Sequence, residues 1–111
     1  MGYCWGGKMA SMVASDQPPM FQAAVQTSPA QLDAGDGANV KIPMMLLSSE
    51  DESDEETKKY SDSLTVPKHC ERFADQVHGF MSARADLKDA RVLEEYTRGY
   101  QLALSFFRAH V

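Results

Sequence analysis

The first seven residues constrain this chain more than any other segment. They read Met-Gly-Tyr-Cys-Trp-Gly-Gly, which contains the pattern Gly-x-Cys-x-Gly-Gly. This pattern is typical of a sharp turn that joins a buried strand to a helix and carries a nucleophilic side chain. The turn would lift the side chain of Cys4 clear of the backbone, and the N-terminus of the following helix would favour its thiolate.

The neighbours of Cys4 fit the same geometry. Gly2 and Gly6 are expected to let the strand and the helix approach closely, where a Cβ atom would obstruct them. The backbone N–H of Trp5 would then point at a developing oxyanion. On this segment alone, a catalytic thiol and an ordinary buried thiol are equal alternatives for Cys4.

A phosphate-binding loop is a competing interpretation of these residues. The segment from Gly2 to Lys8 also fits GxxxxGK, but that motif continues with a Ser or Thr that binds magnesium. Met9 stands at that position, and bulky Tyr3 and Trp5 occupy the part of the loop that needs an open backbone. The sequence therefore disfavours nucleotide binding.

Composition narrows the class of protein. The chain has 111 residues and a net charge of −5, which predicts one small domain and argues against nucleic acid or an anionic membrane as partner. No apolar run approaches the roughly 18 residues of a membrane span, and no signal peptide is evident. Cys4 and Cys70 are expected to be free thiols, without a CxxC metal motif. We expect a cytoplasmic protein without cofactor or metal.

The hydrophobic pattern predicts an α/β fold with about three parallel strands flanked by helices. The continuously apolar run 42–47 indicates a strand that is covered on both faces. Ser53 and Glu56 form a capping-box pattern, and Asp89 is a plausible N-cap. The expected helices are 5–14, 54–64 and 90–109, the expected strands are 21–27, 40–48 and 68–74, and 28–39 and 77–85 are expected loops. The expected packing face of the last helix comprises Val92, Leu93, Tyr96, Tyr100, Ala103, Leu104 and Phe107.

A thiol nucleophile requires a general base. Of three histidines, His78 lies in the loop after the last strand and is followed by Gly79. This is where a catalytic imidazole would be expected at the rim of a parallel sheet. His69 falls inside a predicted strand and is better explained as structural, whereas the penultimate His110 is expected to be solvated.

The acid that orients this base should follow the preceding strand. Asp51 is the first choice there, with Glu50 and Glu52 as flanking candidates. The competing interpretation of this acidic run is a solvated loop and a helix N-terminus. The resulting chain order is Cys4, Asp51, His78, the nucleophile–acid–base order of α/β-hydrolases.

At this point the chain resembles the dienelactone hydrolase family. The resemblance rests on residues 2–8, on 42–47 continuing to Asp51, on 77–84, and on the final segment 94–107. It covers nearly all of residues 1–111, but only the C-terminal half of a family domain with a partial α/β-hydrolase fold. The resemblance implies hydrolysis of small esters or lactones without metal or cofactor.

The same resemblance implies roles for individual residues. Cys4 would be the nucleophile, His78 the general base and Asp51 its orienting acid. Trp5 would supply one oxyanion N–H, and Arg84 is the nearest candidate for holding a substrate carboxylate.

The resemblance does not extend to the N-terminal half of the family domain. A truncated gene model or a partial product is therefore expected. Such a chain would be inactive by itself if that half is essential. Segment 21–27 would then form an exposed sheet edge, which favours self-association. One alternative is therefore a non-catalytic fragment or interaction module that needs a partner to cover this edge. Another is a redox-sensing thiol at Cys4.

Overall fold

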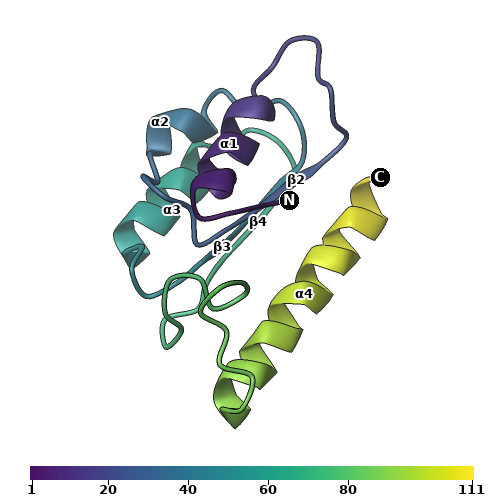
Figure 1. Ribbon diagram of the computed structural model, residues 1–111. Coiled ribbons are helices and arrows are strands. Elements are labelled where there is room, and N and C mark those ends of the chain that lie inside the picture. The colour runs from purple at the N-terminus through teal and green to yellow at the C-terminus, as the bar shows by residue number, and fades with distance from the viewer.

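The computed structural model describes residues 1–111 and shows four parallel strands in one sheet, in the order β1-β2-β3-β4 (Figure 1). Each strand is followed by a helix, as the predicted parallel topology requires. The strands are β1 (Gly2–Tyr3), β2 (Ala24–Thr27), β3 (Met44–Ser48) and β4 (Lys68–Arg72), and the helices are α1 (Trp5–Val13), α2 (Ala34–Gly37), α3 (Asp54–Ser63) and α4 (Ala90–His110).

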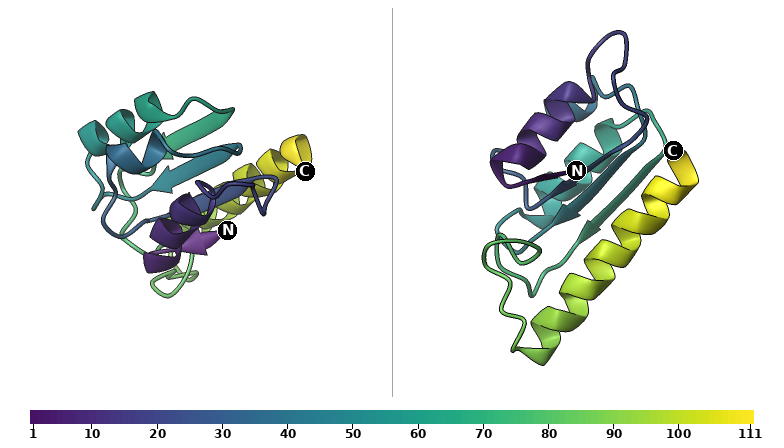
Figure 2. Two further views of the ribbon diagram at one scale, coloured as in Figure 1. Left: turned by 90° about the horizontal axis from the view of Figure 1, so that it is seen from above. Right: turned by 45° about the vertical axis from the view of Figure 1, so that its right-hand side comes forward.

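The sheet lies between two layers of unequal size. Helices α1, α2 and α3 cover one face, and the long helix α4 crosses the other (Figure 2). Strand β3 supplies both cores, because successive side chains point to opposite faces. Met44 and Leu46 pack against Tyr60 under the three-helix layer, whereas Met45 and Leu47 pack against the α4 layer. The prediction that this apolar run is covered on both faces is confirmed.

The predicted α/β class and the three main helices are confirmed, and the C-terminal bound of each helix differs by one residue. Ser53 closes a full capping box with Glu56, and Asp89 accepts hydrogen bonds from the first turn of α4. The expected loop 28–39 contains the one-turn helix α2, for which Asp33 is the N-cap.

Segment 21–27 is not the sheet edge, which corrects the expectation. Gly2 and Tyr3 form a fourth parallel strand and pair with Gln26 and Thr27. Two residues are too few for a periodic pattern, so β1 gives no strand signal of its own. The two edge strands of the sheet are therefore β4 and the two-residue β1, and β2 lies between β1 and β3.

The buried face of α4 also differs from the predicted stripe. The buried residues are Glu95, Gly99, Ala103 and Phe106, while Leu93 and Leu104 are about half exposed. Gly99 is the physical reason, because a Cβ atom there would lie 2.6 Å from the sulfur of Met81. The helix thus turns its smallest residue towards the loop beneath it.

A buried carboxylate joins α4 to the rest of the molecule. Glu95 forms ion pairs with Arg91 and Arg98, and Arg98 also pairs with Glu71 on β4 and lies 4.2 Å from the ring centre of Phe73. Partial burial alone would raise the pKa of Glu71, but Arg98 and His69 outweigh it and lower that pKa. The deprotonated carboxylate is therefore the form that holds the helix.

Candidate functional site

Cys4 occupies the turn between β1 and α1 with a backbone conformation that is rare for a residue with a side chain. Its φ is 53° and its ψ is −119°. The turn is held by four backbone hydrogen bonds. The N–H of Cys4 donates to the carbonyl of Thr27 (3.1 Å), and the Cys4 carbonyl accepts from Gly7 (3.0 Å), Lys8 (3.4 Å) and Ala30 (2.9 Å). Strain of this kind costs about 1–3 kcal/mol and is concentrated at functional sites.

Close approach around the turn depends on Gly2 and Gly7. A Cβ atom on Gly2 would lie 2.0 Å from the carbonyl oxygen of Gly6, and one on Gly7 would lie 3.2 Å from Pro29. A Cβ atom on Gly6 itself would meet nothing within 4 Å. The expectation for Gly2 is confirmed, whereas the expectation for Gly6 is wrong, because only its carbonyl lies at the contact.

Trp5 begins α1, and its N–H donates no hydrogen bond. A free N–H is normal in the first turn of a helix and makes such a turn suited to a negative charge. The indole side chain is exposed. The backbone N–H, rather than the side chain, is therefore the group of Trp5 that could contact an oxyanion.

The loop that follows β2 joins the Cys4 turn to the His78 loop. The N–H of Ala30 donates to the Cys4 carbonyl, and the hydroxyl of Ser28 accepts from the N–H of Gly79 (3.3 Å). Ser28 also donates its own N–H to Leu47 at the end of β3 (2.9 Å). Backbone hydrogen bonds thus link the carboxyl ends of β1, β2 and β3, and the Ser28 hydroxyl links them to the loop after β4. Ligands bind at this end of the strands in parallel sheets.

His78 lies beside a carboxylate, and that carboxylate belongs to Glu52. The distance from His78 Nδ1 to Glu52 Oε2 is 3.9 Å. Glu52 is only 4% exposed, and its carboxylate accepts hydrogen bonds from the hydroxyl of Ser49 (2.7 Å) and from its N–H (3.3 Å). Asp51 is exposed and forms no hydrogen bond or ion pair with His78.

A cleft of about 320 Å³ opens at this position. It is lined by Pro29, Ala30, Gln31, Leu32, Asp51, Glu52, Glu56 and His78. Both acid candidates therefore border the same space as the imidazole, and they differ in burial and in hydrogen bonding.

The remaining predicted residues are not drawn into this cleft. No hydrogen bond joins the sulfur of Cys4 to His78. Arg84 is exposed; its N–H donates to the carbonyl of Gly79 (3.1 Å), and its guanidinium has no partner. His69 contacts Glu71, and the ring of His110 packs against Phe106 rather than being fully solvated.

Sequence reasoning ranked Glu52 below Asp51 and did not consider Ser49. The available signal was the spacing of the two residues, because a serine and a glutamate three positions apart can form a side-chain hydrogen bond around a turn. No group of three or more His, Cys, Asp or Glu side chains is arranged to hold a metal ion. None of the helices has the length and apolarity to cross a membrane.

Comparison with known proteins places the chain in a family. Residues 1–111 match the family described as the dienelactone hydrolase family. The chain belongs to the dienelactone hydrolase family. Two similar proteins from Schizosaccharomyces pombe are described as uncharacterized AIM2 family proteins, and they are 34% and 31% identical over 97% and 96% of this chain. The chain spans 45% and 44% of their lengths.

A first prediction concerns the glycines of this dienelactone hydrolase turn. Gly2→Ala is expected to destabilise the fold by several kcal/mol or to prevent folding, because its Cβ would overlap the Gly6 carbonyl. Gly6→Ala is the matched control and should stabilise α1 by up to about 1 kcal/mol, since alanine is the better helix former. Urea unfolding of both variants measures the effect, and equal stability of the two would contradict this account.

A second prediction concerns the strain at Cys4. Cys4→Gly is expected to raise the free energy of unfolding by about 1 kcal/mol, because glycine adopts a positive φ without a steric cost. Cys4→Ala removes the thiol but keeps the Cβ, so its stability should remain near that of the parent chain. The two variants are compared by urea unfolding, and a glycine variant less stable than the alanine variant would refute the strain argument.

Proposed function

We propose that this chain carries the catalytic edge of a cysteine hydrolase that acts on small esters or lactones. The observation that carries the proposal is Cys4 held at a strained positive φ at the N-terminus of α1, tied through Ala30 to the cleft that contains His78. Membership of the dienelactone hydrolase family supports the same reaction class.

In the proposed mechanism His78 accepts the proton of the Cys4 thiol, and the thiolate attacks the acyl carbon. The carbonyl oxygen becomes negative and is stabilised by the N–H of Trp5 and the first turn of α1. Collapse of this intermediate breaks the ester bond, and His78 returns the proton to the leaving alcohol. Water then attacks the thioester with His78 as base, which releases the carboxylic acid and restores the thiol.

The geometry favours Glu52 over Asp51 as the acid that orients His78. Glu52 is buried, is held by two hydrogen bonds from Ser49, and approaches Nδ1 of the imidazole. A fixed carboxylate at that nitrogen would hold the ring and stabilise the imidazolium that forms when Cys4 loses its proton. Asp51, which the family resemblance implies for this role, borders the same cleft and remains the competing candidate.

A third prediction tests this reaction on the 111-residue chain with a chromogenic acyl ester. Cys4→Ala should reduce turnover to the uncatalysed rate, and His78→Ala should reduce kcat by about 10²–10⁴-fold. Glu52→Gln should lower kcat by about tenfold or more, with KM little changed, because orientation of the base is lost.

Asp51→Asn is the matched control for Glu52→Gln, because it removes the neighbouring charge without touching the Ser49 contacts. A larger loss of kcat in Asp51→Asn would reassign the orienting role to Asp51. Turnover in the Cys4→Ala variant equal to that of the parent chain would reject the hydrolase proposal.

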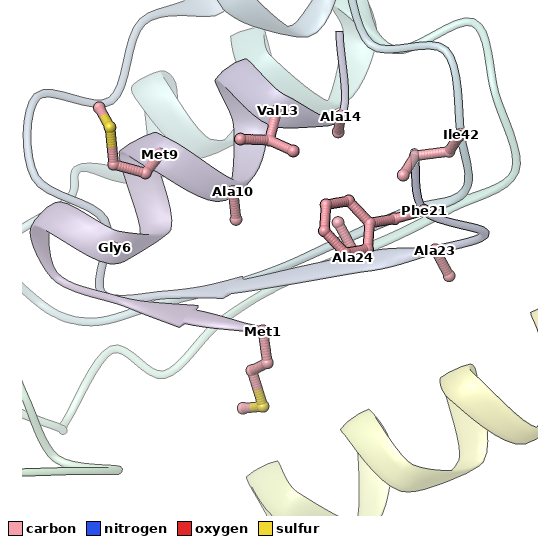
Figure 3. A pocket seen from close by; sticks show the side chains of 10 residues that line it. All are labelled: Met1, Gly6, Met9, Ala10, Val13, Ala14, Phe21, Ala23, Ala24 and Ile42. Atoms are coloured by element: carbon pink, nitrogen blue, oxygen red, sulfur yellow. The ribbon is translucent and has the colours of Figure 1, made fainter. Parts of the chain in front are cut away.

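A second candidate function is an interaction module that covers the open edge of the sheet with another copy of the chain. Beside β1 and under α1 lies an apolar groove of about 240 Å³ (Figure 3). Met1 and Phe21 at this groove are 44% and 56% exposed, and the outer edge of β1 has no strand partner. The groove is lined by Met1, Gly6, Met9, Ala10, Val13, Ala14, Phe21, Ala23, Ala24 and Ile42.

A fourth prediction follows for self-association. Light scattering after size-exclusion chromatography should give twice the mass of one chain, and Phe21→Asp should shift the population to the monomer by placing a charge in the groove. Leu104→Asp, which alters an exposed apolar side chain on α4, is the control and should not. A monomer at every concentration would remove this candidate.

A further inference from the structure

The cleft beside His78 is lined by negative charge. Three of its eight lining residues are the carboxylates of Asp51, Glu52 and Glu56, and none is lysine or arginine. Glu56 also accepts a hydrogen bond from the N–H of Ser53, so it is held at the rim by the cap of α3. Charges of one sign that line a cleft exclude ligands of the same sign.

Lys8 and Arg72 contact residues that line this cleft, and both are already engaged. Lys8 pairs with Asp36 and donates to the carbonyl of Gln31. Arg72 lies behind the acidic loop and donates to the backbone carbonyls of Glu52 (2.7 Å) and Glu50 (3.1 Å). Neither Lys8 nor Arg72 is among the residues that line the cleft.

Arg84 does not supply the missing positive charge. It follows Gly79 in the turn after His78, its side chain is exposed, and it is not among the residues that line the cleft. A substrate carboxylate in the cleft would thus meet three carboxylates and no lysine or arginine.

The acyl oxygen and the acyl chain of a substrate would lie in opposite electrostatic environments. Negative charge at the acyl oxygen is favoured at the N-terminus of α1, where Trp5 has a free N–H. An acyl chain that extends from Cys4 past Ala30 into the cleft would bring its own negative charge to the carboxylates. The site would thus stabilise the negative charge that develops on the acyl oxygen during the reaction, and it would repel a negative charge that the substrate already carries on its acyl chain.

We propose that this site accepts acyl groups that are neutral or cationic and discriminates against those that carry a carboxylate. The inference rests on the proposed hydrolase function for its reaction, although its charge selectivity can be measured without turnover. Repulsion by the cleft carboxylates is expected to give a discrimination of about fivefold at low salt.

A fifth prediction measures this selectivity with two alkylating agents of equal size, neutral iodoacetamide and anionic iodoacetate. The rates of modification of Cys4 are followed by peptide mass analysis, and their ratio is divided by the ratio found for free cysteine. We expect iodoacetate to be disfavoured at Cys4 by a further factor of about five at low salt, and this factor to fall as salt is added.

Two double variants distinguish the effect of the carboxylates that line the cleft from the effect of the protein's net charge. Asp51→Asn with Glu56→Gln removes two lining charges and keeps the capping box, since glutamine serves at that position, and it should bring the ratio close to that of free cysteine. Asp54→Asn with Glu55→Gln removes two charges that do not line the cleft, and it should change the ratio less.

A ratio at Cys4 equal to that of free cysteine would overturn the inference. A preference for iodoacetate that is lost in Arg84→Gln would also overturn it and would assign anion binding to Arg84. Ester turnover is measured separately on the parent chain: charge selectivity without turnover would refute only the hydrolase function, and Cys4-dependent turnover without selectivity would refute only this inference.

Discussion

The structure depends on a single close contact between backbones, where β1 meets the first turn of α1. With hydrogen atoms alone on Gly2, the Gly6 carbonyl can come within a distance that no Cβ atom would permit. This contact lets the chain reverse within one residue, so Cys4 leaves the sheet at its carboxyl end with a free helix N-terminus beside it. Without the contact, α1 would have to move away from β2, and Gly7 would lose its packing on Pro29.

The site is distributed over four segments, yet few interactions assemble it. The loop after β2 contacts the nucleophile turn through Ala30 and the histidine loop through Ser28. The acidic loop after β3 is attached to the histidine loop by the hydrogen bond from the N–H of Glu50 to the carbonyl of Gln76 (2.8 Å). Two of these contacts join backbone to backbone and tolerate changes of side chain, whereas the contact to the histidine loop depends on the hydroxyl of Ser28.

The sequence predicted the parts of the fold that have strong local signals. The apolar run of β3, the capping box at Ser53 and the N-cap at Asp89 are of this kind. The edge strand β1 and the buried face of α4 were missed, since one has only two residues and the other is decided by the fit of Gly99 against Met81. In the candidate site, the positions of Cys4 and His78 on the sheet edge followed from strand order, whereas the choice between Asp51 and Glu52 needed burial and a hydrogen bond from Ser49. Which of the two acids orients the base stays a prediction.

The ionic cluster around Glu95 makes the attachment of α4 sensitive to acid. The lowered pKa of Glu71 means that its carboxylate adds stability above the usual glutamate range, and that this contribution disappears as the pH falls through the lowered value. Protonation of Glu71 would leave Arg98, which lies over the ring of Phe73, with Glu95 as its carboxylate partner. Acid below the usual glutamate range should therefore weaken the ionic attachment of α4, while the apolar contacts of Ala103 and Phe106 still hold the helix on the sheet.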